Sequence, residues 1–436
     1  MSNEKLMNRW WVVIGAILIQ LNLGAMYAWS VFTPYLKGTS SDGVTEFGFT
    51  ATQTQWIFSV SILVFAIVMI FAGRWQDKIG PRKVALSGGI VLGLGYILAK
   101  FFGTSFLGQL ICIGVVGGAG IGLAYVCPLA ASVKWFPDKK GLITGLAVAG
   151  FGFGAMIWVK LGGAWGHLID NYGVLNTFAI YGVLFALSIL LGSIVMVNPP
   201  DGYKPAGWEP PAVKNSAPSG GEDFTPSETF VTPQYWMLWI MYAFSATAGL
   251  LVIGNIKLFG ISSLEANSFV GNASAAAGTA MVIFALMNGI GRITWGTISD
   301  KLGRARSILL MTLLQSIMMI AIIWMGGTIA SLYIAAGLIG FNFGGNFSLF
   351  PTATADFFGP KNLGANYALV FTAYGLSGII GPILGGKVFD VTGSYLWAFI
   401  PASALCLIAA AISLLTKPPH HNEIGSAKTV GAPAGK

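Results

Sequence analysis

Charged side chains are scarce in this sequence of 436 residues. Asp, Glu, Lys and Arg make up only 9% of it, while apolar residues make up 55% and the mean hydropathy is +0.73. A soluble domain has about 25% charged residues. This balance excludes a soluble protein and predicts a chain that crosses a membrane many times. The net charge of +8 is not a nucleic-acid signal, because its placement follows membrane topology.

Cysteine and histidine are rare as well, with three of each. The cysteines all lie in apolar runs, which favours packing roles over a disulfide framework: Cys112, Cys127 and Cys406. No Cys or carboxylate cluster with metal-ligand spacing accompanies the histidines, His167, His420 and His421. No Ser-His-Asp set is apparent. We therefore expect no enzyme, no metal site and no cofactor.

Twelve apolar runs are long enough to cross a bilayer, which takes about 20 helical residues. They lie near residues 10–36, 53–73, 84–103, 106–134, 142–166, 174–198, 235–260, 270–298, 306–325, 328–355, 363–388 and 395–416. Residues 1–7 are polar and the first run is long enough to span, so we expect no cleaved signal peptide. The sequence predicts an all-α membrane protein with twelve transmembrane helices.

The basic residues predict the orientation, because Lys and Arg concentrate in cytoplasmic loops. With both termini inside, all but six of the 24 fall in inner segments; the six are Lys37, Lys100, Lys160, Lys257, Arg292 and Lys387. We expect a multi-pass protein of the cell inner (plasma) membrane with both termini in the cytoplasm.

The chain divides into two halves. Residues 199–233 are rich in Pro, Gly, Ser and charge, which predicts a cytoplasmic linker between a six-helix half at 1–198 and another at 234–417. Residues 418–436 read as a polar cytoplasmic tail. At an offset of 223 residues the halves repeat each other, pairing Gly73 with Gly296, Asp77 with Asp300, Pro128 with Pro351, Phe151 with Tyr374 and Gly152 with Gly375. Such duplication is typical of transporters whose halves rock about a central site.

Arg292 is the only arginine that we place inside a spanning helix. Such a residue costs about 2.5–3.5 kcal/mol on insertion scales and usually faces a cavity. No Asp or Glu lies within an apolar run, so we expect a small organic anion as its partner. Asn288 lies one turn earlier on the same face and would add a second polar group. The alternative is an arginine that snorkels to the cytoplasmic surface.

Aromatic residues recur in the same runs and are candidates for the wall of the cavity: Tyr27, Tyr125, Phe151, Phe343, Phe347, Phe371 and Tyr374. Packing or contact with lipid is the alternative for each. The repeat gives Phe151 and Tyr374 more weight, because equivalent helices of two pseudosymmetric halves face each other across the site.

The duplicated loop runs from Gly73 to Lys83 and from Gly296 to Arg306. It resembles the signature loop of the major facilitator superfamily, of the form G-x-x-x-D-x-x-G-R/K. The resemblance implies that Asp77, Arg82, Asp300 and Arg304 latch the outward-open state, with the carboxylates at helix N-termini. A generic cluster of inner-loop charges is the alternative.

Further stretches resemble the oxalate–formate antiporter family, a branch related to the monocarboxylate transporters. They are Tyr27–Ser30, Gly122–Tyr125, Trp135–Gly141, Thr232–Trp236, Asn288–Arg292, Phe347–Thr352 and Asn366–Tyr367. The resemblance implies that Arg292 binds carboxylate and that Tyr125 lines the site. Phe151, Phe343 and Phe347 stand where the antiporter has a Tyr and Trp cage.

Two departures from that family bear on the substrate. Where the antiporter has a second cation, a lysine in helix 11, this sequence has Tyr374. One cation suits a monoanion, because an unneutralised second carboxylate would be costly in a cavity of low dielectric. Asn288 stands where animal monocarboxylate transporters have a titratable Asp. A proton would then travel with the substrate, or through Asp170 or Asp390 at the outer helix ends.

The expected function is secondary-active transport of a lactate- or pyruvate-like monocarboxylate, by proton-coupled symport and as a monomer. Oxalate/formate exchange is the alternative within this class. A channel or a membrane-embedded sensor is disfavoured by the duplicated halves. Lys257 and Lys387 either draw anions inward or snorkel at the interface.

Overall fold

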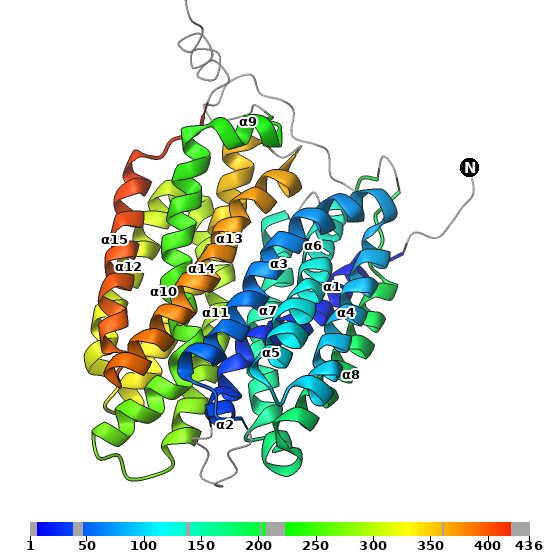
Figure 1. Ribbon diagram of the computed structural model, residues 1–436. Coiled ribbons are helices and arrows are strands. Elements are labelled where there is room, and N and C mark those ends of the chain that lie inside the picture. The colour runs from blue at the N-terminus through cyan, green and yellow to red at the C-terminus, as the bar shows by residue number, and fades with distance from the viewer. Residues whose placement is uncertain are drawn as a thin grey trace, which may run out of the picture.

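The computed structural model describes residues 7–37, 47–136, 140–200, 203–205, 223–359 and 362–419, and over these residues it is helical without strands (Figure 1). The first part contains α1 (Trp10–Leu23), η1 (Gly24–Val31), α2 (Thr33–Lys37), α3 (Ala51–Ile79), α4 (Pro81–Phe102), α5 (Phe106–Gln109), η2 (Leu110–Gly117), α6 (Gly118–Trp135), α7 (Lys140–Gly162) and α8 (Leu168–Ile194). The second contains α9 (Pro226–Val231), α10 (Pro233–Ala266), α11 (Ala273–Leu302), α12 (Arg304–Met325), α13 (Ile329–Phe358), α14 (Leu363–Thr392) and α15 (Leu396–Leu415).

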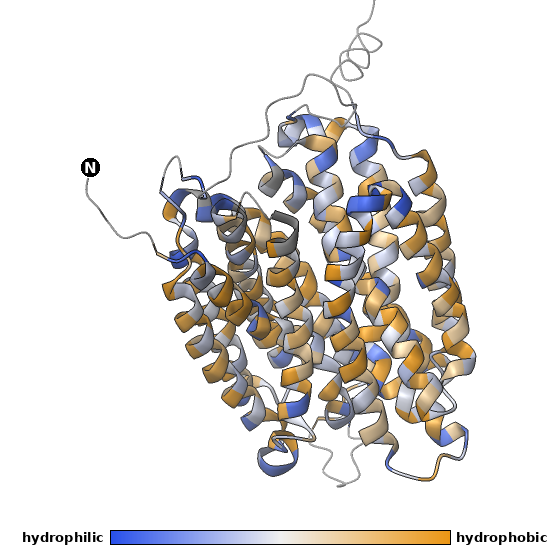
Figure 2. Ribbon diagram, turned by 180° about the vertical axis from the view of Figure 1, so that it is seen from behind, coloured by the Kyte–Doolittle hydropathy of each residue, from blue (hydrophilic) through white to orange (hydrophobic). Residues whose placement is uncertain are grey.

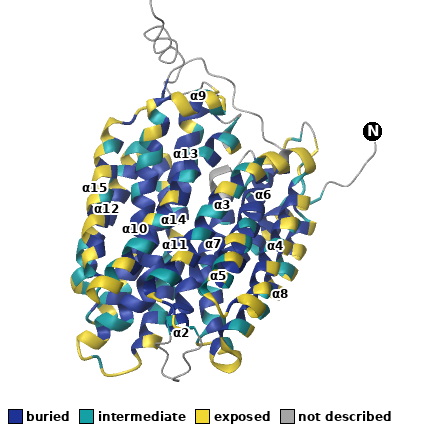
Figure 3. Cartoon of the chain, viewed as in Figure 1, coloured by how far each residue is buried: buried dark blue, intermediate teal, exposed yellow. Residues whose placement is uncertain are grey.

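Twelve helical spans in the described residues are long and apolar enough to cross a membrane, which confirms the prediction from the sequence. Two of them are composite: α1, η1 and α2 form the first span, and α5, η2 and α6 form the fourth. Hydrophobic residues dominate the middle of the helices and hydrophilic ones gather toward their ends (Figure 2). The buried residues face the interior between the helices, while exposed ones lie on the outer sides (Figure 3).

Two bundles, α1–α8 and α10–α15, stand side by side (Figure 1). Here they are called the N-half and the C-half. They meet where α3 packs against α14 and α7 packs against α11. Glycine permits these close approaches: a Cβ at Gly152 of α7 would lie 2.8 Å from the Gly289 nitrogen, and one at Gly378 of α14 would lie 2.3 Å from the Cγ2 of Ile62.

The two ends of the molecule are called here the linker face, which carries α9, and the far face, which carries α2 and the turn between α10 and α11 (Figure 1). The sequence analysis missed α9, which lies inside the expected linker. Its first turn has a capping box between Thr225 and Glu228. Just before it, the Phe224 carbonyl accepts hydrogen bonds from the side chains of Asn362 and Asn366 (2.9 and 3.0 Å), which ties this segment to the C-half.

The duplicated loops turn the chain at equivalent glycines. Gly80 ends α3 and begins α4, and Gly303 does the same for α11 and α12. Their φ angles are +88° and +85°, with ψ at 151° and 158°. This combination is almost confined to glycine. The sharp turn therefore explains why both copies of the loop carry Gly at this position.

We predict that Gly303→Ala destabilises the protein by about 1–3 kcal/mol, because alanine does not adopt this backbone conformation without strain. A Cβ at Gly303 would meet no atom within 4 Å, so the cost is conformational alone. Gly364→Ala is the matched control: a Cβ there is equally free of contacts, and no positive φ is required. Thermal unfolding in detergent should show a lower Tm for the first variant only; equal values would contradict the assignment.

Candidate functional site

The guanidinium of Arg292 lies fully buried between the two halves. Its Nε donates a hydrogen bond to Oδ1 of Asn288, one turn earlier on α11 (3.0 Å). Its Nη1 donates to the carbonyl oxygen of Val148 on α7 (2.9 Å), in the other half. The side chain therefore bridges α11 and α7 and does not reach the surface.

Two nitrogen donors of Arg292 and Asn288 have no acceptor. Nη2 of Arg292 and Nδ2 of Asn288 are buried and donate no hydrogen bond. Among the described residues, no Asp or Glu forms an ion pair with Arg292. An unpaired buried donor costs about 1–3 kcal/mol, and more when it is charged. Both donors would be satisfied by an acceptor with two oxygens, such as a carboxylate.

Aromatic rings from both halves cover the guanidinium. Its carbon lies 4.0 Å from the ring centroid of Phe347, on α13, and 5.5 Å from that of Phe151, on α7. Such contacts favour a cation within about 6 Å of a ring and exclude water from it. The positive charge is thus held in an apolar environment, where its attraction to an anion is stronger than in water.

Tyr27 and Tyr374 join the halves beside this cation. Their hydroxyl oxygens are 2.7 Å apart, linking η1 to α14, and both side chains are buried. The Tyr27 ring lies 4.9 Å from Phe151 and 5.8 Å from Phe343, centroid to centroid. The Tyr374 ring lies 5.3 Å from Phe347.

Tyr125 and Phe371 complete the cluster. Their centroids are 5.8 Å apart with an interplanar angle of 29°, and Tyr125 also contacts Phe151 at 5.8 Å. The hydroxyls of Tyr27 and Tyr125 both interact electrostatically with Arg292. The structure therefore brings together all nine side chains that the sequence singled out for the substrate site: Tyr27, Tyr125, Phe151, Asn288, Arg292, Phe343, Phe347, Phe371 and Tyr374.

Sequence reasoning did not name several rings of this cluster as site residues, among them Phe65, Tyr242, Phe284 and Tyr367. Phe65 of α3 lies 5.0 Å from Tyr125 and 5.2 Å from Phe371. Tyr242 of α10 lies 6.3 Å from Tyr374. The repeat offset of 223 residues pairs Phe65 with Asn288, so the duplication contained a signal for Phe65. Tyr242 is paired with an isoleucine and carries no such signal.

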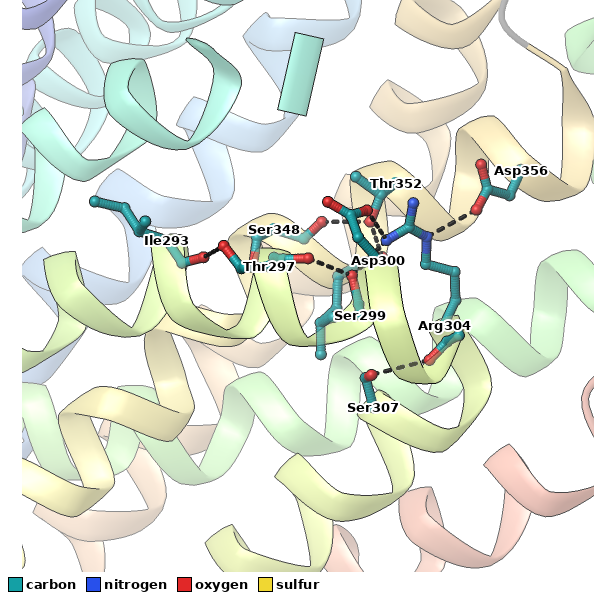
Figure 4. Close-up of polar contacts among 12 residues, drawn as sticks. Ile293, Thr297, Ser299, Asp300, Arg304, Ser307, Ser348, Thr352 and Asp356 are labelled. Carbon is teal, nitrogen blue, oxygen red and sulfur yellow. Dashed lines mark hydrogen bonds and ion pairs between the residues drawn. The ribbon is translucent and has the colours of Figure 1, made fainter. Parts of the chain in front are cut away.

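The residues expected to latch the halves lie on the linker face. Arg304 pairs with Asp300 (2.8 Å) and with Asp356 at the end of α13 (2.7 Å), which the sequence analysis did not name (Figure 4). All three belong to the C-half. Arg82 is exposed, and the side chain of Asp77 lies outside the described residues.

Two repeated six-helix bundles that meet around a buried cation define a membrane transport protein. The model of the Major Facilitator Superfamily matches residues 14–328 and 259–435, and the chain belongs to that superfamily. It is therefore a transporter and not an enzyme.

Among its relatives, the chain is 30% identical over 371 residues to an uncharacterized MFS-type transporter, YhjX, of Escherichia coli (strain K12), covering 85% of this chain and 86% of that one. It is 28% identical over 426 residues to the oxalate:formate antiporter of Oxalobacter formigenes, covering 96% and 93%. A solved structure of a bacterial homolog of the human lysosomal transporter Spinster, inward-facing and unoccupied, shares the fold, with a TM-score of 0.66 and 17% identity over 94% of this chain and 96% of that chain.

We predict that Tyr27→Phe and Tyr374→Phe each destabilise the protein by about 1–3 kcal/mol, because each leaves one buried hydroxyl without its partner. The double variant should lose clearly less stability than the sum of the two single losses, since it leaves no buried hydroxyl without a partner. Thermal unfolding of the three variants measures this coupling. Tyr333→Phe, outside the cluster, is the control; additive losses would contradict a direct bond across the halves.

Proposed function

We propose that this protein carries a small monocarboxylate, of the lactate or pyruvate type, across the cell inner membrane by alternating access. The two halves, 1–198 and 234–417, rock about Arg292 as a monomer. The linker 199–233 and the tail 418–436 lie in the cytoplasm. The gradient that drives accumulation is that of protons.

An anionic substrate is supported by two buried donors that have no hydrogen-bond acceptor, Nη2 of Arg292 and Nδ2 of Asn288. Burial of these donors without a counter-charge is costly, and a carboxylate would offset that cost. The donors belong to α11, while the Val148 carbonyl and the Phe151 ring belong to α7. A bound anion would therefore change the interaction between the helices that move against each other.

Among the nine side chains of the site, Arg292 is the one cation, which supports a monoanion over a dianion. Tyr374 stands where the resembling antiporter has its second cation, and Tyr374 is bonded to Tyr27. Lys387, farther along α14, is exposed. The rings of Phe151, Phe343 and Phe347 offer only apolar surface, which suits the methyl group of a substrate such as lactate.

Proton coupling has to work without a titratable group at position 288 of α11, because Asn288 stands where animal monocarboxylate transporters have an acid. In this proposal the proton crosses with the substrate, or by way of Asp170 or Asp390 at the far face. In the outward-open state, the linker face would be held closed by the four residues of the signature loops: Asp77, Arg82, Asp300 and Arg304.

Oxalate/formate exchange is the second candidate, favoured by the similarity to the Oxalobacter antiporter over 96% of this chain. One of that protein's two named substrates, formate, is itself a monocarboxylate. The two candidates differ in whether uptake requires an anion on the opposite side or a proton gradient.

We predict that Arg292→Ala lowers uptake of labelled L-lactate into proteoliposomes by about 100-fold, the effect of losing a hydrogen-bonded charge worth about 3 kcal/mol. Arg292→Lys should give an intermediate loss, because an ammonium keeps the charge without the planar fork.

Lys100→Ala, an exposed cation on α4, is the matched control and should transport normally. Gel filtration of each purified variant verifies that it is inserted and folded. Uptake at normal affinity by folded Arg292→Ala would refute the assignment.

A further inference from the structure

The first turn of α3, at the far face, depends on the other half of the molecule. The leading amides of a helix have no acceptor in the helix itself. The Thr50 hydroxyl accepts from the amide of Gln53 (3.1 Å). The carboxylate of Asp390, near the end of α14, accepts from the amides of Ala51 (3.2 Å) and Thr52 (3.0 Å), and the Thr52 hydroxyl also donates to it.

The repeat-equivalent helix has a comparable cap from its own preceding residue but, in the part of the chain that the structure describes, no carboxylate from the other half. α11 begins beside Asn272, whose own side chain accepts from the amide of Ala275 (2.9 Å). The residue equivalent to Asp390 is His167, which is exposed and lies 3.5 Å from Asp170 in its own half. In the described residues, a carboxylate of one half therefore accepts hydrogen bonds from the other half at the α3–α14 contact. Among the same residues, no such bond is present at the α7–α11 contact.

Two cation–ring contacts also join the halves at α2, and one of these rings is bonded within the N-half. Lys37 of α2 lies 4.3 Å from the ring centroid of Phe389, the residue before Asp390. Lys257 of α10, only 5% exposed, lies 5.6 Å from the ring of Tyr35. The Tyr35 hydroxyl donates to Asp170 of α8 (2.9 Å). These cations of one half thus face aromatic rings of the other.

Glycines along the same pair of helices show where the two helices approach each other closely. A Cβ at Gly386 of α14 would lie 3.1 Å from the Ala51 carbonyl oxygen, and one at Gly375 would lie 2.8 Å from the Ala66 Cβ. At the other end of the same helices, a Cβ at Gly73 or at Gly364 would meet no atom within 4 Å. The α3–α14 contact is therefore close at the far face and in the middle, and neither Gly73 nor Gly364 has a close neighbour at the linker face.

We propose that Asp390 is the latch of a far-face gate. Its carboxylate closes the gate by holding the positive end of α3, where an anion is favoured both by the free amides and by the helix dipole. Opening toward the far face breaks these bonds and leaves the amides of Ala51 and Thr52 to water. Asp390 thus sets the balance between the two end states of transport, on the face opposite the duplicated signature loops.

The test is a distance measurement by pulsed electron spin resonance in nanodiscs, without substrate. Spin labels at the exposed residues Tyr172 and Val270, one in each half, report the far face. Labels at Trp75 and Leu302 report the linker face. The buried native cysteines are replaced by alanine. Asp390→Asn should raise the ratio of far-face-open to far-face-closed protein about tenfold, the effect of losing hydrogen bonds to a charge.

Thr52→Ala supplies a second, milder variant in case Asp390→Asn folds poorly. It removes one of the three donors to Asp390. Each of the two label distances should therefore shift in the same direction as in Asp390→Asn, by a smaller amount. Thr392→Val is the matched control, because its hydroxyl bonds to Val388 and Ser394 within its own half. Unchanged distances in Asp390→Asn and Thr52→Ala, or an equal shift in Thr392→Val, would overturn the proposal.

Discussion

A guanidinium without a counter-carboxylate, buried at the boundary between two halves, is the constraint on which the centre of this molecule depends. Arg292 is held by Asn288 on its own helix and by the Val148 carbonyl across the interface. Phenylalanine rings shield it, and one of its nitrogens has no acceptor. In the proposed mechanism an anion completes this site, and the two sides of the site belong to halves that move against each other.

The packing around this site allows such motion without loosening the interior. Helices α3, α7, α11 and α14 meet through glycines that bring backbones into contact, so the halves have smooth surfaces where they touch. Directional bonds across the boundary in the described residues come from five side chains or pairs: Arg292 with the Val148 carbonyl, Tyr27 with Tyr374, Gln55 with the Gly254 carbonyl, Ser30 with the Met281 sulfur, and Asp390 with the start of α3 at the far face. If the halves rock as proposed, only a small number of hydrogen bonds between them have to break. Each of these bonds stabilises one end state of the motion over the other.

Much of this was predictable from the sequence, because a bilayer imposes strong rules. Long apolar runs predicted the number of spanning helices, and the repeat predicted equivalent loops in the two halves. Arg292 was found because a charge in an apolar run is expensive. The contacts that depend on tertiary approach were not predictable. Phe65, Tyr242 and Asp356 look like ordinary members of their helices until packing brings them to their partners. The capping of α3 by Asp390 joins residues more than 300 positions apart, which no local pattern indicates.

The most direct test of the proposed function is uptake of labelled L-lactate into proteoliposomes that contain the wild-type protein. Uptake is measured with and without an inward proton gradient, and with or without oxalate or formate inside. We expect accumulation that follows the proton gradient and needs no internal anion. Uptake that ignores the gradient and requires internal oxalate or formate would contradict monocarboxylate symport and establish an exchanger.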